Sequence, residues 1–278
     1  MILTEPKPFK EALQAMADKV AMPTDASSAQ LAQLAPALRE RALFSARTTN
    51  ANYLQKISDV VTRIVSPETR DGRPTMPGEY MDPATGRLEL KKALQSIGYH
   101  PDPNKRGGIQ DLSSDARLNL IVKTNTEMAQ GYGSFVRGQD PGALDAWPAQ
   151  ELYRLESRLR PRDWVGRWLS SGGKVYGGKM IALKNSPIWT DMSRFGLPYP
   201  PFDFNSGMWV RDVALADAVS FGLITRAEDI PQPQQRPLNE DVWTSASPAQ
   251  QRSGLLDSLL ASMGKAAQLV DGIIRLRG

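Results

Sequence analysis

The residues from Lys184 to Trp209, KNSPIWTDMSRFGLPYPPFDFNSGMW, constrain the fold more than any other stretch of the chain. They include six of its twenty aromatic side chains and four of its prolines. Prolines lack an amide donor and fix φ, so neither a helix nor a central strand can run through this stretch. Large rings are also rarely left in water. We therefore predict an ordered, irregular loop whose structural anchors are Trp189, Phe195, Pro200, Pro201 and Phe202.

The composition argues against most catalytic classes. The chain has no cysteine, which excludes disulfides and thiolate metal sites, and its single histidine, His100, rules out the usual histidine-based metal sites. Glu127, Glu151, Asp163 and Asp203 are candidates for an acid/base pair, but no spacing brings two of them together. We predict no catalytic residue, no metal and no cofactor, with Asp203 as the residue that leaves an enzymatic role open.

The chain has the composition of a globular protein. It has 278 residues, of which 41% are hydrophobic, enough for one large core or two modest ones. No apolar run approaches the roughly 18 residues that span a bilayer. The first residues, MILTEPKPFKEALQAM, carry charge and proline where a signal peptide has its apolar segment. We expect a protein that is made and folded in a cytoplasm.

The spacing of apolar residues predicts an α+β protein that is mainly α. Apolar residues at spacings of three and four continue from Ala37 to Val65, which predicts one long helix. A returning helix over Leu88 to Ile97 would complete an αα-hairpin within a helical N-terminal region of residues 1–108. Further helices are predicted over residues 9–20, 111–136, 148–159, 162–169 and 214–221, and another beginning near Ser27 or Ser28.

Residues 109–228 are expected to form a compact domain. Within it Lys174 to Leu183, with Gly177-Gly178 as its turn, is the best candidate for a β-hairpin. Residues 229–253 are rich in Pro, Gln and Ser and predict a linker. Residues 254–278 predict an amphipathic helix that either binds a partner or returns to its own core. The residues predicted to bind a partner are Leu256, Leu259, Leu260, Met263, Val270 and Ile274.

Positive charge is concentrated in one segment. Between Arg154 and Lys184 there are eight basic residues and two acidic ones, while the whole chain has a net charge of only +4. Arginine interleaved with aromatic residues suits phosphate contact and base stacking. The alternative is a solvated helix face with Glu151–Arg154 and Glu156–Arg160 pairs. The candidate nucleic-acid-binding residues are Arg154, Arg158, Arg160, Arg162, Arg167 and Lys174.

Four motifs resemble one protein family. Arg117 to Gly131, RLNLIVKTNTEMAQG, resembles the helix of the Mu-F-type phage minor head proteins (the head morphogenesis domain). Glu151 to Gly173 is similar to the family's Arg-rich stretch that leads to a Gly, and Ile188-Trp189 and Pro200-Pro201 match its tryptophan and its Pro-Pro close. The resemblance covers roughly residues 85–224.

The chain also departs from the family pattern. Many members have a His after the Arg-rich segment, where this chain has Arg162-Asp163-Trp164. Many end in Cys-Arg-Cys, where this chain has Gly207 to Arg211. No metal or thiol role therefore carries over from those members.

The resemblance implies a structural minor head protein of a tailed phage or of a prophage-derived particle. Such a protein binds at the portal vertex inside the capsid, in multiple copies, and assists head assembly and DNA packaging or delivery. Its partners would be the portal protein, other virion proteins and DNA, and it would pass through the host cytoplasm during assembly. Two alternatives remain: an enzyme or toxin-like cargo that uses Glu127 or Asp203, and a stand-alone DNA-binding protein.

Overall fold

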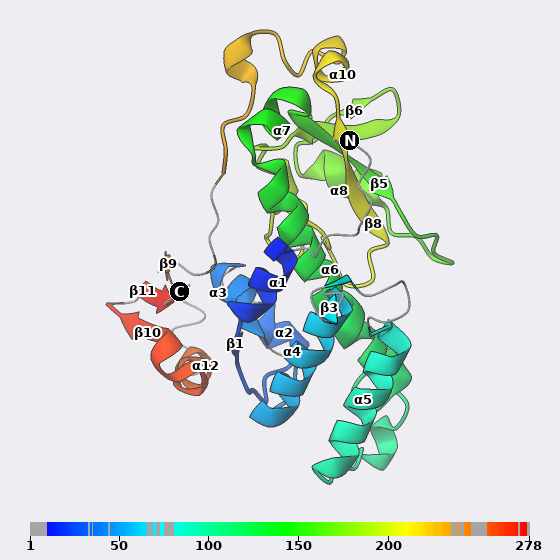
Figure 1. The fold of residues 1–278 in the computed structure, drawn as a ribbon, viewed down its shortest axis with the longest axis vertical. Helices are drawn as coiled ribbons and strands as arrows, with labels where there is room; N and C mark the ends of the chain where they lie inside the picture. The colour runs from blue at the N-terminus through cyan, green and yellow to red at the C-terminus, as the bar shows by residue number, and fades with distance from the viewer. Residues whose placement is uncertain are drawn as a thin grey trace. The chain divides into compact units, whose positions relative to one another are not determined.

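The computed structural model describes residues 10–32, 34, 36–43, 45–65, 69–70, 73–74, 81–234, 238, 242–245, 255–271 and 273–276. The chain forms two compact units, which are drawn in Figure 1. Unit 1 comprises Met1–Ala129 and Pro237–Gly278, and unit 2 comprises Gln130–Arg236. Helices predominate and the sheets are small, which confirms the predicted mainly helical α+β class. No described helix is both long enough and apolar enough to span a bilayer.

Unit 1 is built mostly from helices. Its core contains Leu54 and Ile57 of α4, Leu90 and Leu94 of α5, and Leu118 of α6. Helices α4 and α5 pack together, as predicted for this part of the chain. The helices that contribute to unit 1 are α1 (Lys10–Ala17), α2 (Ser28–Leu31), α3 (Pro36–Arg41), α4 (Ala51–Val65), α5 (Pro83–Ser96), the first part of α6 (Asp115–Gly138) and α12 (Leu255–Met263). Its N-terminal strands are β1 (Val20–Ala21), parallel to β2 (Ala42–Leu43), and β3 (Thr69–Arg70), antiparallel to β4 (Arg73–Pro74).

The prediction of one long helix from Ala37 to Val65 is wrong. Helix α3 ends at Arg41, and α4 begins at Ala51. Between them Arg47 has a positive φ of 58°, and the side chain of Asn50 accepts a hydrogen bond from the Tyr53 amide. Asn50 thus caps a new helix, because its short side chain satisfies an amide that has no partner within the helix.

The single C-terminal helix predicted over residues 254–278 is also wrong. Helix α12 ends at Met263, and strands β10 (Ala267–Val270) and β11 (Ile273–Leu276) follow. β11 pairs antiparallel with both β10 and β9 (Val242–Ser245), so part of the predicted linker is a strand. Asp271, between the two strands, has a positive φ of 50°, the left-handed conformation that tight hairpin turns use.

Much of the predicted C-terminal apolar stripe packs within unit 1. Leu260, Met263 and Ile274 are buried in a core cluster that also contains Leu34 and Leu38. These contacts favour the return of the segment to its own core. Of the other stripe residues, Val270 is exposed, and the side chains of Leu256 and Leu259 lie outside the described residues. In the predicted linker, residues 235–237, 239–241 and 246–253 also lie outside them.

Unit 2 contains a four-stranded antiparallel sheet with the strand order β6-β7-β5-β8. The strands are β5 (Ala149–Arg154), β6 (Val175–Tyr176), β7 (Lys179–Leu183) and β8 (Met208–Val213). β6 and β7 form the predicted hairpin, and Gly177 and Gly178 both have positive φ at its turn. The helices of this unit are the last part of α6, α7 (Pro141–Ala146), α8 (Trp164–Ser170), α9 (Ile188–Asp191) and α10 (Leu215–Ser220).

The helix predicted over residues 148–159 does not form, because its first half is strand β5. This strand pairs with β7 on one side and β8 on the other, and these remote ladders override the local helical preference. The expected helical Glu151–Arg154 pair is therefore absent. Glu151 instead accepts two hydrogen bonds from the Arg211 guanidinium on β8, at 2.9 and 3.0 Å.

The loop between β7 and β8 packs as an ordered segment, and all five of its predicted anchors are buried. Trp189 stacks on Phe202 at 5.9 Å between ring centroids and meets Trp168 edge-on at 5.2 Å. Its indole N–H donates to the Leu183 carbonyl at 2.9 Å. Tyr199 packs against Tyr132 and Phe135 of α6, at 5.8 and 5.6 Å. The loop is thus held on the helix by aromatic contacts, with Asp203 one residue beyond the buried Phe202.

Candidate nucleic-acid interface

Asp203 begins a tight turn two residues after the Pro-Pro pair. Its carboxylate is held by its own backbone, since the Phe204 amide donates to Oδ1 at 2.8 Å. The Ser206 amide donates to the Asp203 carbonyl at 3.2 Å, and Asn205 has a positive φ of 48°. An asparagine tolerates this left-handed conformation better than most residues do. The turn therefore presents the Asp203 carboxylate in one orientation, with only 6% of its side chain exposed.

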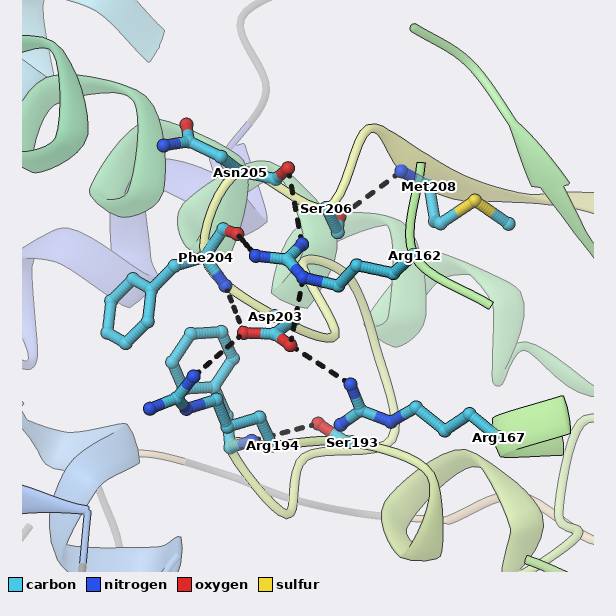
Figure 2. A network of polar contacts seen from close by, with 10 residues as sticks. Arg162, Arg167, Ser193, Arg194, Asp203, Phe204, Asn205, Ser206 and Met208 are labelled. Carbon is cyan, nitrogen blue, oxygen red and sulfur yellow. Dashed lines mark hydrogen bonds and ion pairs between the residues drawn. The ribbon is translucent and has the colours of Figure 1, made fainter. Parts of the chain in front are cut away.

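Three arginines converge on this carboxylate, and Figure 2 shows their guanidinium groups around it. Arg167, on α8, donates to Oδ2 at 3.0 Å. Arg194, in the loop after α9, lies 3.6 Å from Oδ1, and Arg162, just before α8, lies 3.8 Å from Oδ2. We call Arg162, Arg167, Arg194 and Asp203 the arginine cluster.

Further contacts orient each guanidinium. Arg162 donates to the Phe204 carbonyl at 2.8 Å and to the Asn205 carbonyl at 3.4 Å. Arg167 lies over the Trp164 ring at 4.9 Å, and Arg194 lies over the Phe204 ring at 5.5 Å. Cation–π contacts of this kind restrain long side chains that water would otherwise leave mobile. The cluster is thus preorganised by groups of unit 2 itself.

The arginine cluster has an excess of positive charge. Three guanidinium groups face one carboxylate, and the side chains of Arg162, Arg167 and Arg194 are 46%, 29% and 50% exposed. Each exposed ion pair contributes little to stability on its own. Arg162 also donates to two backbone carbonyls, so the attraction for a ligand comes from the net positive charge of three partly exposed guanidinium groups around one carboxylate. Such a charge suits a phosphate or another oxyanion.

The other predicted nucleic-acid-binding residues lie in the same unit. Arg158 pairs with Glu156 at 2.6 Å. Arg154, Arg160 and Lys174 are exposed and form no ion pair with another described residue. The structure therefore brings Arg162 and Arg167 together on Asp203, whereas Arg154, Arg160 and Lys174 face solvent.

The sequence pattern gave no indication of Arg194, and it left Asp203 as a possible catalytic group. Arg194 lies beyond the basic segment, in the aromatic loop, where no charge pattern distinguishes it. Glu127, the other proposed catalytic carboxylate, pairs with Lys123 on its own helix at 3.2 Å. No group of His, Cys, Asp or Glu side chains suited to hold a metal occurs among the residues that the structure describes.

Gly207 connects the turn after Asp203 to the chain that follows β5. Its carbonyl accepts from the amides of Leu155 and Glu156, at 2.9 and 3.1 Å. Its φ is +64°, and a Cβ there would lie 2.8 Å from the Glu156 carbonyl oxygen and 3.1 Å from Nε of Arg158. Only glycine fits this close approach.

Comparisons with protein-family models, with curated proteins and with solved structures give no match for this chain. The resemblance to the Mu-F-type minor head proteins therefore stays a prediction from the motifs.

Proposed function

We propose that this protein is a non-enzymatic, structural minor head protein of a tailed phage or prophage-derived particle, bound at the portal vertex. In this role it assists head assembly and DNA packaging or delivery. The observation that carries the proposal is the arginine cluster, in which one buried carboxylate holds three partly exposed guanidinium groups. The assignment to the virion rests on the motif resemblance.

DNA backbone phosphate is the ligand that the arginine cluster fits best. Three arginines and one aspartate give the cluster a net charge of +2, and the contacts described above already orient the three guanidinium groups. Phosphodiester oxygens accept bidentate hydrogen bonds from arginine without regard to base sequence. A protein that handles a whole packaged genome needs contacts of this sequence-independent kind. The exposed Arg154, Arg160 and Lys174 would add charge around the same duplex.

The contact with portal or other virion proteins is assigned to the exposed side of the C-terminal hairpin. Val270 and Ile273 are a cross-strand pair on one face of the hairpin, and both are exposed. Ile274, on the opposite face, is buried. A partner that covers Val270 and Ile273 would remove their apolar surface from solvent.

The DNA contact is tested by measuring duplex binding by the full chain over a range of NaCl concentrations. We expect log Kd to depend linearly on log salt, and the double variant Arg162→Gln/Arg194→Gln to lower the slope by about 1 for each phosphate that it no longer neutralises. The matched control is Arg226→Gln, an exposed arginine of unit 2 that pairs with Glu228 and Asp229. An unchanged slope in the double variant would remove the DNA role from the arginine cluster.

Particle composition tests the rest of the proposal. Purified particles should contain the protein, and particles made with the double variant should package or deliver less DNA. DNA binding by a protein that is missing from the particles would support the stand-alone DNA-binding alternative instead.

A further inference from the structure

Leu159 is fully exposed in the loop that joins β5 to α8. In Figure 1 the chain runs on beyond the end of β5 before it returns toward α8. Leu159 lies in the sequence Ser157-Arg158-Leu159-Arg160-Pro161, so an apolar side chain is presented between two arginines. Single exposed leucines are common on protein surfaces. What distinguishes Leu159 is its place between two arginines in a loop that is held at both ends.

Both ends of this loop are attached to the same turn. At its start, the amides of Leu155 and Glu156 donate to the Gly207 carbonyl, at 2.9 and 3.1 Å. At its end, Arg162 donates to the Phe204 carbonyl at 2.8 Å. Pro161 fixes its own φ and restricts Arg160 to extended conformations. Hydrogen bonds therefore restrain both ends of the loop, and Leu159 is exposed between them, three residues before Arg162 of the arginine cluster.

The charge of the loop indicates a polyanionic partner. Residues 154–163 contain four arginines and two carboxylates. Both carboxylates are engaged within the unit, since Glu156 pairs with Arg158 and Asp163 accepts from the Gly166 amide at the start of α8. Arg154 and Arg160 remain for contacts outside the chain.

The small apolar surface of this loop distinguishes between a membrane, a protein and duplex DNA as its partner. Leu159, with the half-exposed Leu155 at the start of the same loop, buries too little surface to hold a protein on a membrane. The two leucines also lack the cluster of large side chains that dominates protein interfaces. A single Leu flanked by arginines is instead what a minor-groove wedge requires. Such wedges separate one base step, while arginines occupy the narrow groove and contact phosphates.

We propose that Leu159 inserts between adjacent base pairs from the minor groove of duplex DNA and kinks it, while the exposed Arg154 and Arg160 contact the groove and backbone nearby. This inference rests on the proposed DNA contact and adds which groove of the DNA is entered and how the duplex is deformed. Burial of the leucine offsets the cost of unstacking, so the wedge changes the shape of the DNA more than the affinity for it. Kinks of this kind are about 20–90°.

The experiment uses the full chain and a short duplex with dyes at both ends and 2-aminopurine at a central TpA step, the kind of step that is most easily unstacked. Energy transfer between the dyes reports bending, and 2-aminopurine fluorescence reports unstacking. The variants are Leu159→Ala, the conservative Leu159→Met, and the control Leu169→Ala, which truncates a half-exposed leucine on α8.

We expect the wild type, Leu159→Met and Leu169→Ala to raise both signals. Leu159→Ala should reduce both to the level of free DNA while it weakens binding by less than about tenfold. Salt-dependent binding without either signal would overturn the wedge and leave the proposed DNA contact in place. No binding at low salt would overturn both. Binding to phosphatidylserine vesicles that needs Leu159, with DNA signals independent of it, would assign the loop to a membrane and overturn the wedge.

Discussion

Gly131 of α6 and Pro200 of the aromatic loop approach so closely that a Cβ on Gly131 would lie 1.9 Å from the Pro200 carbonyl oxygen. This contact joins the helix to the loop at the point where the chain turns toward Asp203. No side chain fits between the two backbones, so residue 131 has to be glycine.

Gly131→Ala should therefore destabilise unit 2, although alanine is the better helix former. The clash is with backbone, which cannot rotate away, and overpacking of this kind costs about 1–3 kcal/mol or more. Denaturant unfolding followed by tryptophan fluorescence measures the cost. The control is Gly138→Ala on the same helix, where the nearest atom would be Lys184 Nζ at 3.5 Å. Equal stability of the two variants would contradict the contact.

Trp189 offers a graded test of the aromatic core. Trp189→Ala removes a fully buried ring and should cost about 3–5 kcal/mol. Trp189→Phe keeps an aromatic ring but leaves the Leu183 carbonyl without its indole donor, which should cost about 1–3 kcal/mol. Calorimetry on both variants separates ring packing from the hydrogen bond, and equal destabilisation would show that packing of the ring contributes little.

Asp203→Asn tests whether the carboxylate holds the arginine cluster together. The variant leaves three guanidinium groups close together without their shared counter-charge, so we expect stability to fall by about 2 kcal/mol. Part of the effect should disappear at high salt, because the guanidinium groups are partly exposed. Glu228→Gln, in a pair whose side chains are mostly exposed, should change stability by less than about 0.5 kcal/mol. Similar destabilisation in the two variants would sink the idea that Asp203 organises the cluster.

Acid should weaken unit 1 through Glu89. Hydrogen bonds from Arg63 and then Lys56 lower the pKa of Glu89 from 4.5 to about 2. A carboxylate with a depressed pKa stabilises the fold above its unfolded pKa, and the contribution is lost as pH falls from about 4.5 to about 2. The side chains are 28–36% exposed, so screening limits the contribution to about 1 kcal/mol. Urea unfolding at pH 6 and pH 2 should differ less in Glu89→Gln than in the wild type; identical differences would show that Glu89 is not responsible.

The two faces of the C-terminal hairpin separate a folding role from a partner role. Ile274→Asp buries an unpaired charge in unit 1 and should cost more than about 3 kcal/mol. Val270→Asp places the charge on the exposed face and should leave the melting temperature nearly unchanged while it lowers the amount of protein in purified particles. Normal incorporation of Val270→Asp would remove this face from the partner contact. A deletion of residues 254–278 cannot make this distinction, because it also removes part of the core.

Local signals predicted the elements that depend on local interactions. Helices α6 and α8 and the β6–β7 hairpin lie close to their predicted positions, because caps, glycine turns and apolar spacing act within a few residues. Strand β5 was predicted as a helix and β8 was missed, since each depends on a ladder with a remote partner. The C-terminal strands were also predicted as a helix. Their apolar residues fit a helical spacing, and β11 pairs with the remote strand β9, which local patterns do not indicate.

The candidate site was predictable only in part. Positive charge along the sequence indicated Arg162 and Arg167 as anion-binding residues. Their shared counter-ion could not be found this way, because Arg167 and Asp203 are 36 positions apart in the sequence and meet only in the folded unit. Arg194 joins them from the aromatic loop, where composition pointed to packing alone. Sequence thus located the charge, whereas the packing of the loop determined which charges act together.

Unit 1 is formed by two segments that are far apart in the sequence, and this affects how the chain can fold during its synthesis on the ribosome. Residues 130–236 form unit 2 as one uninterrupted segment, so it can fold as soon as it has emerged. The cluster that contains Leu34 and Leu38 is complete only when Leu260, Met263 and Ile274 have also been made. The N-terminal apolar side chains must therefore wait through the translation of more than two hundred further residues. During that interval they are the part of the nascent chain most in need of a chaperone.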